Sequence, residues 1–323
     1  MSIWVGIDVS AKTLDFGWSI DGKKTHFKIE NNPKKFKEAL AACPEGACFC
    51  MEATGSYYLN IALFLDAQTR HVSVINPRRI KHFMGSDLSR SKSDKADAYG
   101  IARFGTEKQP SPWMPVTPEM AEMQQLRALA DKLEVQMGQL SNQEHAFTQS
   151  SLACKAALKA IKTVTKAIAK EQEIILEQMA QIAERSFPRQ VAVISSIKGI
   201  GRLTAVRLIA SVGDFSRFKT SRQLVSFLGL SPTLKQSGTS VHSRGHISRL
   251  GGTRMRRDLY FCAVSAAQYN PQCKDMWDRM EKANKPGKVI LMAIENKLIR
   301  QMHAMVMSDS LYDPNYATFA LAS

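Results

Sequence analysis

Four acidic side chains in the N-terminal third of the chain have the types and positions of a metal-binding catalytic site. Asp8 stands near the end of the apolar run of residues 4–10, and Glu52 ends the apolar run of residues 47–51. Asp94 and Asp97 are three residues apart, which places both on one face of a helix. Carboxylate oxygens favour a hard cation such as Mg²⁺, with water completing its shell. Such a site stabilises the attacking and leaving oxygens of a phosphodiester.

Each of these acids also has a structural explanation when it is taken alone. An Asp at the end of a strand caps the next turn, as Asp8 would. Acids in the first turn of a helix, as Asp94 and Asp97 would be, complement the helix dipole by about 0.3–1 kcal/mol each. The metal hypothesis is favoured by the four acids together, because gathered carboxylates repel one another unless a cation compensates them.

The hydrophobic pattern predicts the elements that carry Asp8 and Glu52. Residues 1–30 predict three meandering strands, since apolar residues alternate along residues 14–20 and Asp21-Gly22 is a strong hairpin turn. Helices and strands then alternate, which predicts a mixed α/β sheet with helices on its faces. Both acids fall at C-terminal strand ends, where open α/β sheets place their ligands. The elements expected after the meander are a helix from 31–33 onward, a strand over 47–51, a helix over 57–68 with Leu59, Ala62, Leu63 and Leu65 inward, a strand over 71–75 and a basic helix from 76–79.

Asp94 and Asp97 need a helix of their own. Ser93 is a suitable N-cap for a helix that begins within residues 91–102. The stretch from Pro110 to Pro118 is rich in proline and reads as the first linker. Residues 1–109 are therefore expected to form the first domain.

A heptad pattern runs through residues 117–186. An unbroken register of this length predicts a coiled coil. A single helix would extend roughly 90–100 Å at 1.5 Å per residue, so a hairpin folded back near Ser141-Asn142 or Ser150-Ser151 is the alternative. Because an isolated seam needs a partner, we infer self-association as a dimer or tetramer. One seam position is apolar throughout, at Leu126, Leu133, Leu140, Phe147, Cys154, Ile161, Ile168, Ile175 and Ile182.

The third segment, residues 189–323, carries most of the positive charge. Residues 189–260 contain 13 basic and two acidic residues, a net +11 of the chain's +15. A solvated face would mix signs, so we expect this segment to contact the phosphates of a nucleic acid. The candidate nucleic-acid contacts over the whole chain are Arg78, Arg79, Lys81, Lys92, Lys198, Gly199, Gly201, Arg202, Lys235, Arg244, Arg249, Arg254, Arg256 and Arg257.

Two short motifs lie within this segment. Residues 197–205, with Gly199 and Gly201, resemble a helix-hairpin-helix element whose backbone amides hold a phosphate, although a plain helix connection is the alternative. Ser237 precedes a glycine in the loop of residues 233–246, where cations are at hand at Lys235, His242, Arg244 and His246. A serine and a glycine in a loop usually make only a turn. A nucleophilic serine would need a base and such cations.

The order of these motifs resembles the DEDD-type insertion-sequence transposases. These are the RuvC-like recombinases of insertion-sequence family one hundred and ten, which are related to pilin-gene invertases. The resemblance implies a ribonuclease-H-like first domain whose acids Asp8, Glu52, Asp94 and Asp97 hold Mg²⁺, a coiled-coil spacer and a mainly helical transposase domain. It also implies a serine nucleophile that maps to Ser237, with Ser231, Ser240 and Ser243 close by, and a covalent phosphoserine–DNA intermediate. Family members are guided by a non-coding bridge RNA that pairs with donor and target DNA.

Composition argues against membrane-spanning, secreted and disulfide-rich proteins. No stretch approaches the ~18 apolar residues of a membrane span, and the N-terminus lacks a signal-peptide pattern. Six cysteines without CxxC spacing indicate reduced thiols and a cytoplasmic protein. Two alternatives stay open beside the recombinase. One is a metal-dependent Holliday-junction-type endonuclease with water as nucleophile, and the other is a non-catalytic nucleic-acid scaffold.

Overall fold

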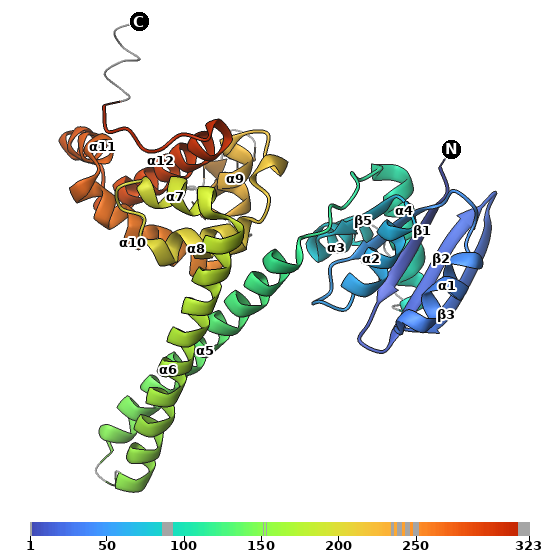
Figure 1. The fold of residues 1–323 in the computed structure, drawn as a ribbon, viewed down its shortest axis with the longest axis horizontal. Coiled ribbons are helices and arrows are strands. Elements are labelled where there is room, and N and C mark those ends of the chain that lie inside the picture. The colour runs from blue at the N-terminus through green and yellow to red at the C-terminus, as the bar shows by residue number, and fades with distance from the viewer. Residues whose placement is uncertain are drawn as a thin grey trace, which may run out of the picture. The chain divides into compact units, whose positions relative to one another are not determined.

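The computed structural model describes residues 2–85, 93–150, 152, 154–233, 236–237, 241–242, 246–247 and 252–315. The chain folds as two compact units, residues 1–115 and 116–323. Figure 1 draws both units as a ribbon. Within the described ranges, no helix combines the length and the apolar character that crossing a membrane requires.

The first unit is built on a five-stranded mixed sheet in the order β3-β2-β1-β4-β5. The strands β1 (Trp4–Val9), β2 (Thr13–Ile20) and β3 (Lys23–Glu30) form the expected antiparallel meander. The strands β4 (Cys48–Glu52) and β5 (Val72–Ile75) extend it in parallel beside β1. At the hairpin between β2 and β3, Asp21 and Gly22 both take positive φ angles, 49° and 80°, as a type I′ turn requires. The predicted mixed sheet is thus confirmed.

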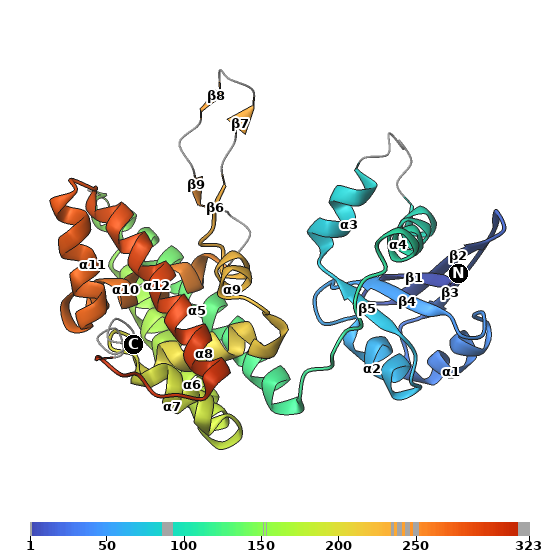
Figure 2. The same ribbon diagram turned by 90° about the horizontal axis from the view of Figure 1, so that it is seen from above.

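Helices cover both faces of this sheet. The side chains of Asn32, Asn76 and Ser93 cap α1 (Pro33–Ala41), α3 (Pro77–Met84) and α4 (Asp94–Lys108) by accepting hydrogen bonds from backbone N–H groups, and the predicted N-cap Ser93 is thus confirmed. Helices α1 and α2 pack on one face, and α3 and α4 lie over the other (Figure 2). Leu63 of α2 is 45% exposed, so its expected inward position was wrong, and Ile61 is buried in its place. The four helices are α1 (Pro33–Ala41), α2 (Leu59–Ala67), α3 (Pro77–Met84) and α4 (Asp94–Lys108).

Helix α4 lies unusually close to β1 and β2, and two glycines make this possible. A Cβ atom on Gly6 would lie 2.1 Å from the carbonyl oxygen of Ala98, and one on Gly17 would lie 3.1 Å from the Ala98 Cβ. At the other end of α4, Gly105 lies against the ring of Trp4. The helix therefore runs antiparallel to β1, and its first turn lies near the C-terminal end of that strand.

The second unit begins with a long helical hairpin. Helices α5 (Pro118–Thr148) and α6 (Lys155–Ser186) run side by side (Figure 1). The chain folds back between them, close to the Ser150-Ser151 alternative of the sequence prediction. The seam residues Ile161, Ile175 and Ile182 of α6 are buried. The seam thus finds a partner within the chain, and self-association stays a prediction that the seam by itself does not require.

The remaining helices pack around the base of this hairpin. Met120 and Met123 of α5 and Met179 and Ala183 of α6 belong to the same core as the C-terminal helices. The predicted segments 117–186 and 189–323 therefore share one core, and their division into separate domains stays a prediction. The C-terminal elements are α7 (Pro188–Ser196), α8 (Arg202–Val212), the 3₁₀ turn η1 (Phe215–Arg217), α9 (Ser221–Phe227), α10 (Thr253–Tyr269), α11 (Pro271–Lys282) and α12 (Gly287–Ser308).

Short strand pairs stand where the sequence predicted a loop. Strand β6 (Pro232–Thr233) pairs with β9 (His246–Ile247), and β7 (Gln236–Ser237) pairs with β8 (Val241–His242), both antiparallel (Figure 2). Ser237 is thus in a β-ladder, opposite Val241. Four candidate nucleic-acid contacts lie outside the described residues, namely Lys92, Lys235, Arg244 and Arg249.

Candidate active site and nucleic-acid interface

The register of the sheet places acids on neighbouring strands at one level. Asp8 of β1 is directly opposite Asp15 of β2, and Asp15 is directly opposite Lys28 of β3. On the other side of β1, Ile7 pairs with Met51, so the next positions, Asp8 and Glu52, end two adjacent parallel strands. The sequence alone could not establish this adjacency of β1 and β4.

The first turn of α4 brings the two remaining acids to the same place. Close packing over Gly6 and Gly17 sets the helix start beside the end of β1. The pKa of Asp8 is raised from 3.8 to about 6 in this environment. Burial is the main cause, and the negative charges of Asp97, Asp94, Asp15 and Glu52 add to it. The structure thus gathers the four predicted acids and adds a fifth, Asp15.

A lysine stands among these carboxylates. The Nζ atom of Lys28 lies 3.0 Å from Oδ2 of Asp15 and 3.0 Å from Oδ2 of Asp94. Hydrogen bonds to Asp94 and Asp15 raise the pKa of Lys28, and the hydrogen bond from Lys28 lowers the pKa of Asp94. The other oxygen of Asp15, Oδ1, lies 2.9 Å from Nε2 of His26. Both oxygens of Asp15 are therefore engaged.

The donor set suits a hard divalent cation, because every candidate ligand is a carboxylate. Burial, and after it the neighbouring negative charges, raise the pKa of Asp8. Within the described residues, however, no three acidic, histidine or cysteine side chains are arranged as a ready metal cluster. Asp94 is turned to Lys28 in this arrangement. The chemistry of the acids fits Mg²⁺, and their side chains must rearrange to coordinate it.

Asp15 and Lys28 were missed in the sequence, although a signal for them exists. The Asp21-Gly22 turn fixes the register of β2 against β3, so counting back from it pairs Asp15 with Lys28. The period of two then places Asp15 on the same face as Gly17. To place Asp15 beside Asp8, one must also know that β2 pairs with β1.

A short turn joins α7 to α8 where the sequence suggested a helix-hairpin-helix element, and that element stays a prediction beside the plain helix connection. Gly199 has a φ of +107°, and a Cβ there would lie 2.7 Å from the Ala266 Cβ of α10. Packing against α10 therefore explains this glycine without a phosphate. Gly201 precedes α8 with nothing within 4 Å of its Cβ direction, which leaves room beside the first amides of the helix. Lys198, in the same turn, is exposed.

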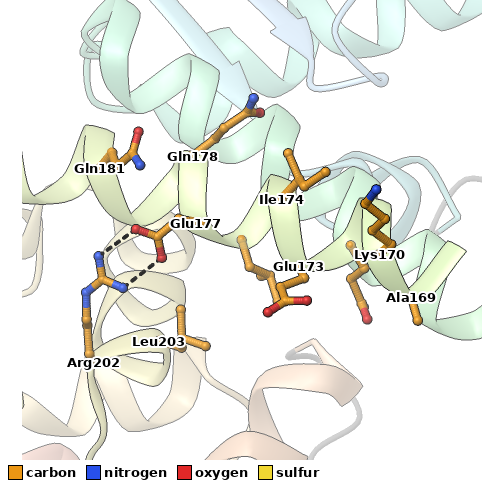
Figure 3. A pocket seen from close by; sticks show the side chains of 11 residues that line it. Ala169, Lys170, Glu173, Ile174, Glu177, Gln178, Gln181, Arg202 and Leu203 are labelled. Atoms are coloured by element: carbon orange, nitrogen blue, oxygen red, sulfur yellow. Dashed lines mark hydrogen bonds and ion pairs between the residues drawn. The ribbon is translucent and has the colours of Figure 1, made fainter. Parts of the chain in front are cut away.

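Arg202 is the first residue of α8, and its guanidinium forms ion pairs with two glutamates of α6. Its Nη1 and Nη2 atoms lie 2.9 Å and 3.1 Å from the two carboxylate oxygens of Glu177 (Figure 3). Its Nε also donates to Glu184. The pair borders a surface depression of about 740 Å³ that α6 lines together with Arg202 and Leu203. To bind a phosphate, Arg202 must leave these carboxylates.

Arginines of α10 likewise form ion pairs with an acidic residue of α5. Arg254 and Arg257 both pair with Glu134, and Nε of Arg254 also donates to Asp258 over 3.0 Å. The buried Arg207 of α8 lies 3.1 Å from Asp131 of α5. The positive charge counted along residues 189–260 is thus partly neutralised by residues from outside that segment.

The other candidate contacts differ in how accessible they are. Arg256 is half-buried and donates to Thr253. In the first unit the three basic side chains of α3, Arg78, Arg79 and Lys81, are exposed, and Arg79 lies over the ring of Phe104 at 5.6 Å. Lys198 of the second unit is exposed as well.

Comparison with known proteins identifies the class. A family model for the DEDD transposases of IS110 elements matches residues 5–150, which include all four predicted acids. A second model, described as the transposase IS116/IS110/IS902 family, matches residues 191–278. The chain belongs to the IS110-family DEDD transposases and is an enzyme of the class that cuts and rejoins DNA.

Individual relatives resemble nearly the whole chain. The pilin gene-inverting protein of Moraxella bovis is 27% identical over 319 residues, which cover 96% of this chain and 97% of that protein. The transposase for insertion sequence element IS1328 of Yersinia enterocolitica is 23% identical and covers 92% of this chain and 94% of its own. The transposase for insertion sequence element IS1111A of Coxiella burnetii is 27% identical, with coverage of 78% and 74%.

Proposed function

We propose that this transposase cuts and rejoins donor and target DNA with two sets of residues, a carboxylate tetrad and a serine. Asp8, Glu52, Asp94 and Asp97 would hold Mg²⁺ at the ends of β1 and β4 and the start of α4. When bound there, the cation would neutralise the carboxylates and stabilise charge on the oxygens of the scissile phosphodiester. The ribonuclease-H-like character of this unit belongs to the same proposal, and the antiparallel meander followed by parallel strands supports it.

One observation gives the main support for metal binding by the four acids. Three separate elements deliver acids close enough together that, with burial, they raise the pKa of Asp8 to about 6. A structural cap or a helix-dipole acid gives no reason to bring the others to the same place. Perturbed carboxylates that converge at strand ends are typical of functional sites. Calorimetric titration of the whole chain with Mg²⁺ tests the tetrad, and each acid-to-amide variant is expected to weaken binding at least tenfold.

Ser237 supplies the second half of the proposed chemistry. Its oxygen attacks the phosphorus, an O–P bond to serine forms, and the P–O bond to one deoxyribose breaks. The serine proton passes to the departing deoxyribose oxygen, so the exchange is balanced and conserves a phosphodiester. Another DNA hydroxyl reverses the step and rejoins the strand without an external energy source. The support for this half is the position of Ser237 in the β7–β8 ladder, within the segment matched by the second family model.

Trapping the covalent adduct separates this proposal from the endonuclease alternative. Denatured wild-type protein is expected to carry DNA on Ser237, identified by mass spectrometry, and Ser237→Ala is expected to carry none. Free 5′-phosphate ends without an adduct would favour water as the nucleophile, as in a junction endonuclease. Nucleic-acid binding without any DNA cleavage, unaffected by Asp94→Asn and by removal of Mg²⁺, would favour the non-catalytic scaffold.

Guidance by a bridge RNA and assembly into a dimer or tetramer complete the proposal. The basic residues support a polyanionic partner and do not distinguish RNA from DNA. Sequencing the nucleic acid that co-purifies with the chain tests for a guide. If active sites are built between subunits, a mixture of Asp8→Ala and Ser237→Ala proteins regains activity that neither has alone. Failure to complement would count against assembly of the active site between subunits.

A further inference from the structure

We propose that Lys28 is a resident cation of the active site, which engages Asp94 and competes with a divalent metal for it. Lys28 is thus a positioning residue that acts through Asp94. This inference rests on the proposed function of the tetrad. Its basis is the contact that Lys28 makes with both Asp15 and Asp94.

The geometry gives Lys28 two carboxylate partners that differ in exposure. Its Nζ lies 3.0 Å from a carboxylate oxygen of Asp15 on β2 and 3.0 Å from one of Asp94 on α4. The Asp15 side chain is 4% exposed, whereas that of Asp94 is 63% exposed. The lysine therefore bridges a fixed carboxylate in the sheet and an accessible one at a helix start.

Asp15 is the fixed side of the bridge and is not a further metal ligand. One of its oxygens lies 2.9 Å from Nε2 of His26 and the other meets Lys28. Its place in the middle of β2, directly between Asp8 and Lys28, allows little movement. When a metal enters the tetrad, Asp15 keeps both of its partners, His26 and Lys28. Lys28 therefore stays bound to Asp15 after it has released Asp94.

Asp94 is the side that moves. It is the first residue of α4, and Lys28 engages its Oδ2 atom. A divalent ion coordinated by several carboxylates attracts Asp94 more strongly than a single ammonium does. Because the pair is exposed, Lys28 opposes the metal only modestly, and removing it is expected to tighten Mg²⁺ binding about two- to fivefold. In the absence of metal, the same contact compensates part of the negative charge around Asp8.

Calorimetric titration of the full chain with Mg²⁺, free of nucleic acid, tests the inference. Lys28→Met is expected to bind Mg²⁺ two- to fivefold more tightly than wild type. Lys24→Met is the matched control, since Lys24 lies on the same strand and face and its Nζ is 5.3 Å from the Tyr99 ring centroid. This control is expected to leave the affinity unchanged.

Two further variants guard against misfolding and against a general charge effect. Asp15→Asn combined with Lys28→Gln leaves the net charge unchanged and places two neutral hydrogen-bonding groups opposite each other. It is still expected to tighten binding, because Asp94 is released. In an Asp94→Asn background, replacing Lys28 by Met should have no further effect, since there is nothing left to release.

The outcomes distinguish the inference from the proposed function. If wild type binds no Mg²⁺, the metal-binding tetrad itself fails. If wild type binds Mg²⁺ and neither Lys28→Met nor the charge-neutral double variant binds more tightly, Lys28 does not restrain Asp94. A gain that persists in the Asp94→Asn background would mean that Lys28 acts by simple charge repulsion, which also overturns the inference.

Discussion

Replacing Asp8 by Asn is expected to stabilise the metal-free first unit at neutral pH while removing a metal ligand. Burial and the neighbouring negative charges raise the pKa of Asp8 from 3.8 to about 6. A carboxyl with a higher pKa in the folded state contributes stability below its unfolded pKa, and this stability is lost as pH rises through the folded pKa. Between pH about 4 and about 6, wild type therefore loses free energy of unfolding that the amide, which does not titrate, retains.

The magnitude follows from the size of the shift. A change of about two pKa units corresponds to roughly 3 kcal/mol at 1.36 kcal/mol per unit. Asp8 is only half-buried, so solvent screening reduces the expected gain to about 1–2 kcal/mol above pH 6. Saturating Mg²⁺ should reverse the order, because the cation stabilises only the protein that binds it.

Hydrogen exchange of the β1 and β2 amides, corrected for intrinsic rates, measures this unit by itself. Without metal, Asp8→Asn is expected to be more protected than wild type at pH 7.5 and equal to it at pH 4. Asp21→Asn, at an exposed turn of the same unit, should change protection by less than about 0.5 kcal/mol. A variant that is less protected than wild type at pH 7.5, or equally stabilised at both pH values, would refute the reasoning.

Two other predictions follow from the packing and from the ion pairs. Gly6→Ala forces α4 off the sheet, so we expect a loss of about 1–3 kcal/mol in unfolding free energy and weaker Mg²⁺ binding. Gly138→Ala, with open space at its Cβ, should instead raise the unfolding free energy by about 0.5–1 kcal/mol. Equal effects of the two substitutions in urea unfolding would contradict the close packing of α4 on Gly6. Replacing Glu177 and Glu184 by Gln frees Arg202, and the salt dependence of duplex binding should steepen by about one phosphate contact, a log–log slope of ~0.9. Fluorescence anisotropy over a salt series checks this, and an unchanged slope would show that Arg202 does not reach DNA.

The strands and their acids were predictable because local patterns determine them. Alternation along β2, the Asp21-Gly22 turn and the apolar runs ending at Asp8 and Glu52 are all short-range signals. The inward position assigned to Leu63 failed because α2 is apolar on most of its circumference, so its sequence does not single out one face.

The ionic partners were not predictable from local sequence. Arg202 and Arg254 were counted as nucleic-acid contacts because residues 189–260 contain few acids, but Glu177 and Glu134 reach them from the hairpin. The role of Gly6 was equally hidden, since only the packing of α4 shows that a Cβ there would collide. Pairings between residues far apart in sequence depend on the assembled fold.

A metal-binding carboxylate tetrad and Ser237 are proposed to act in one reaction. The most direct test is mass-spectrometric detection of the Ser237–DNA adduct, using DNA that carries the ends of the element. The adduct is expected in wild type with Mg²⁺, and it should be absent after chelation and in Asp8→Asn, Glu52→Gln and Asp97→Asn proteins. An adduct that forms equally without the acids or without the metal would contradict the account.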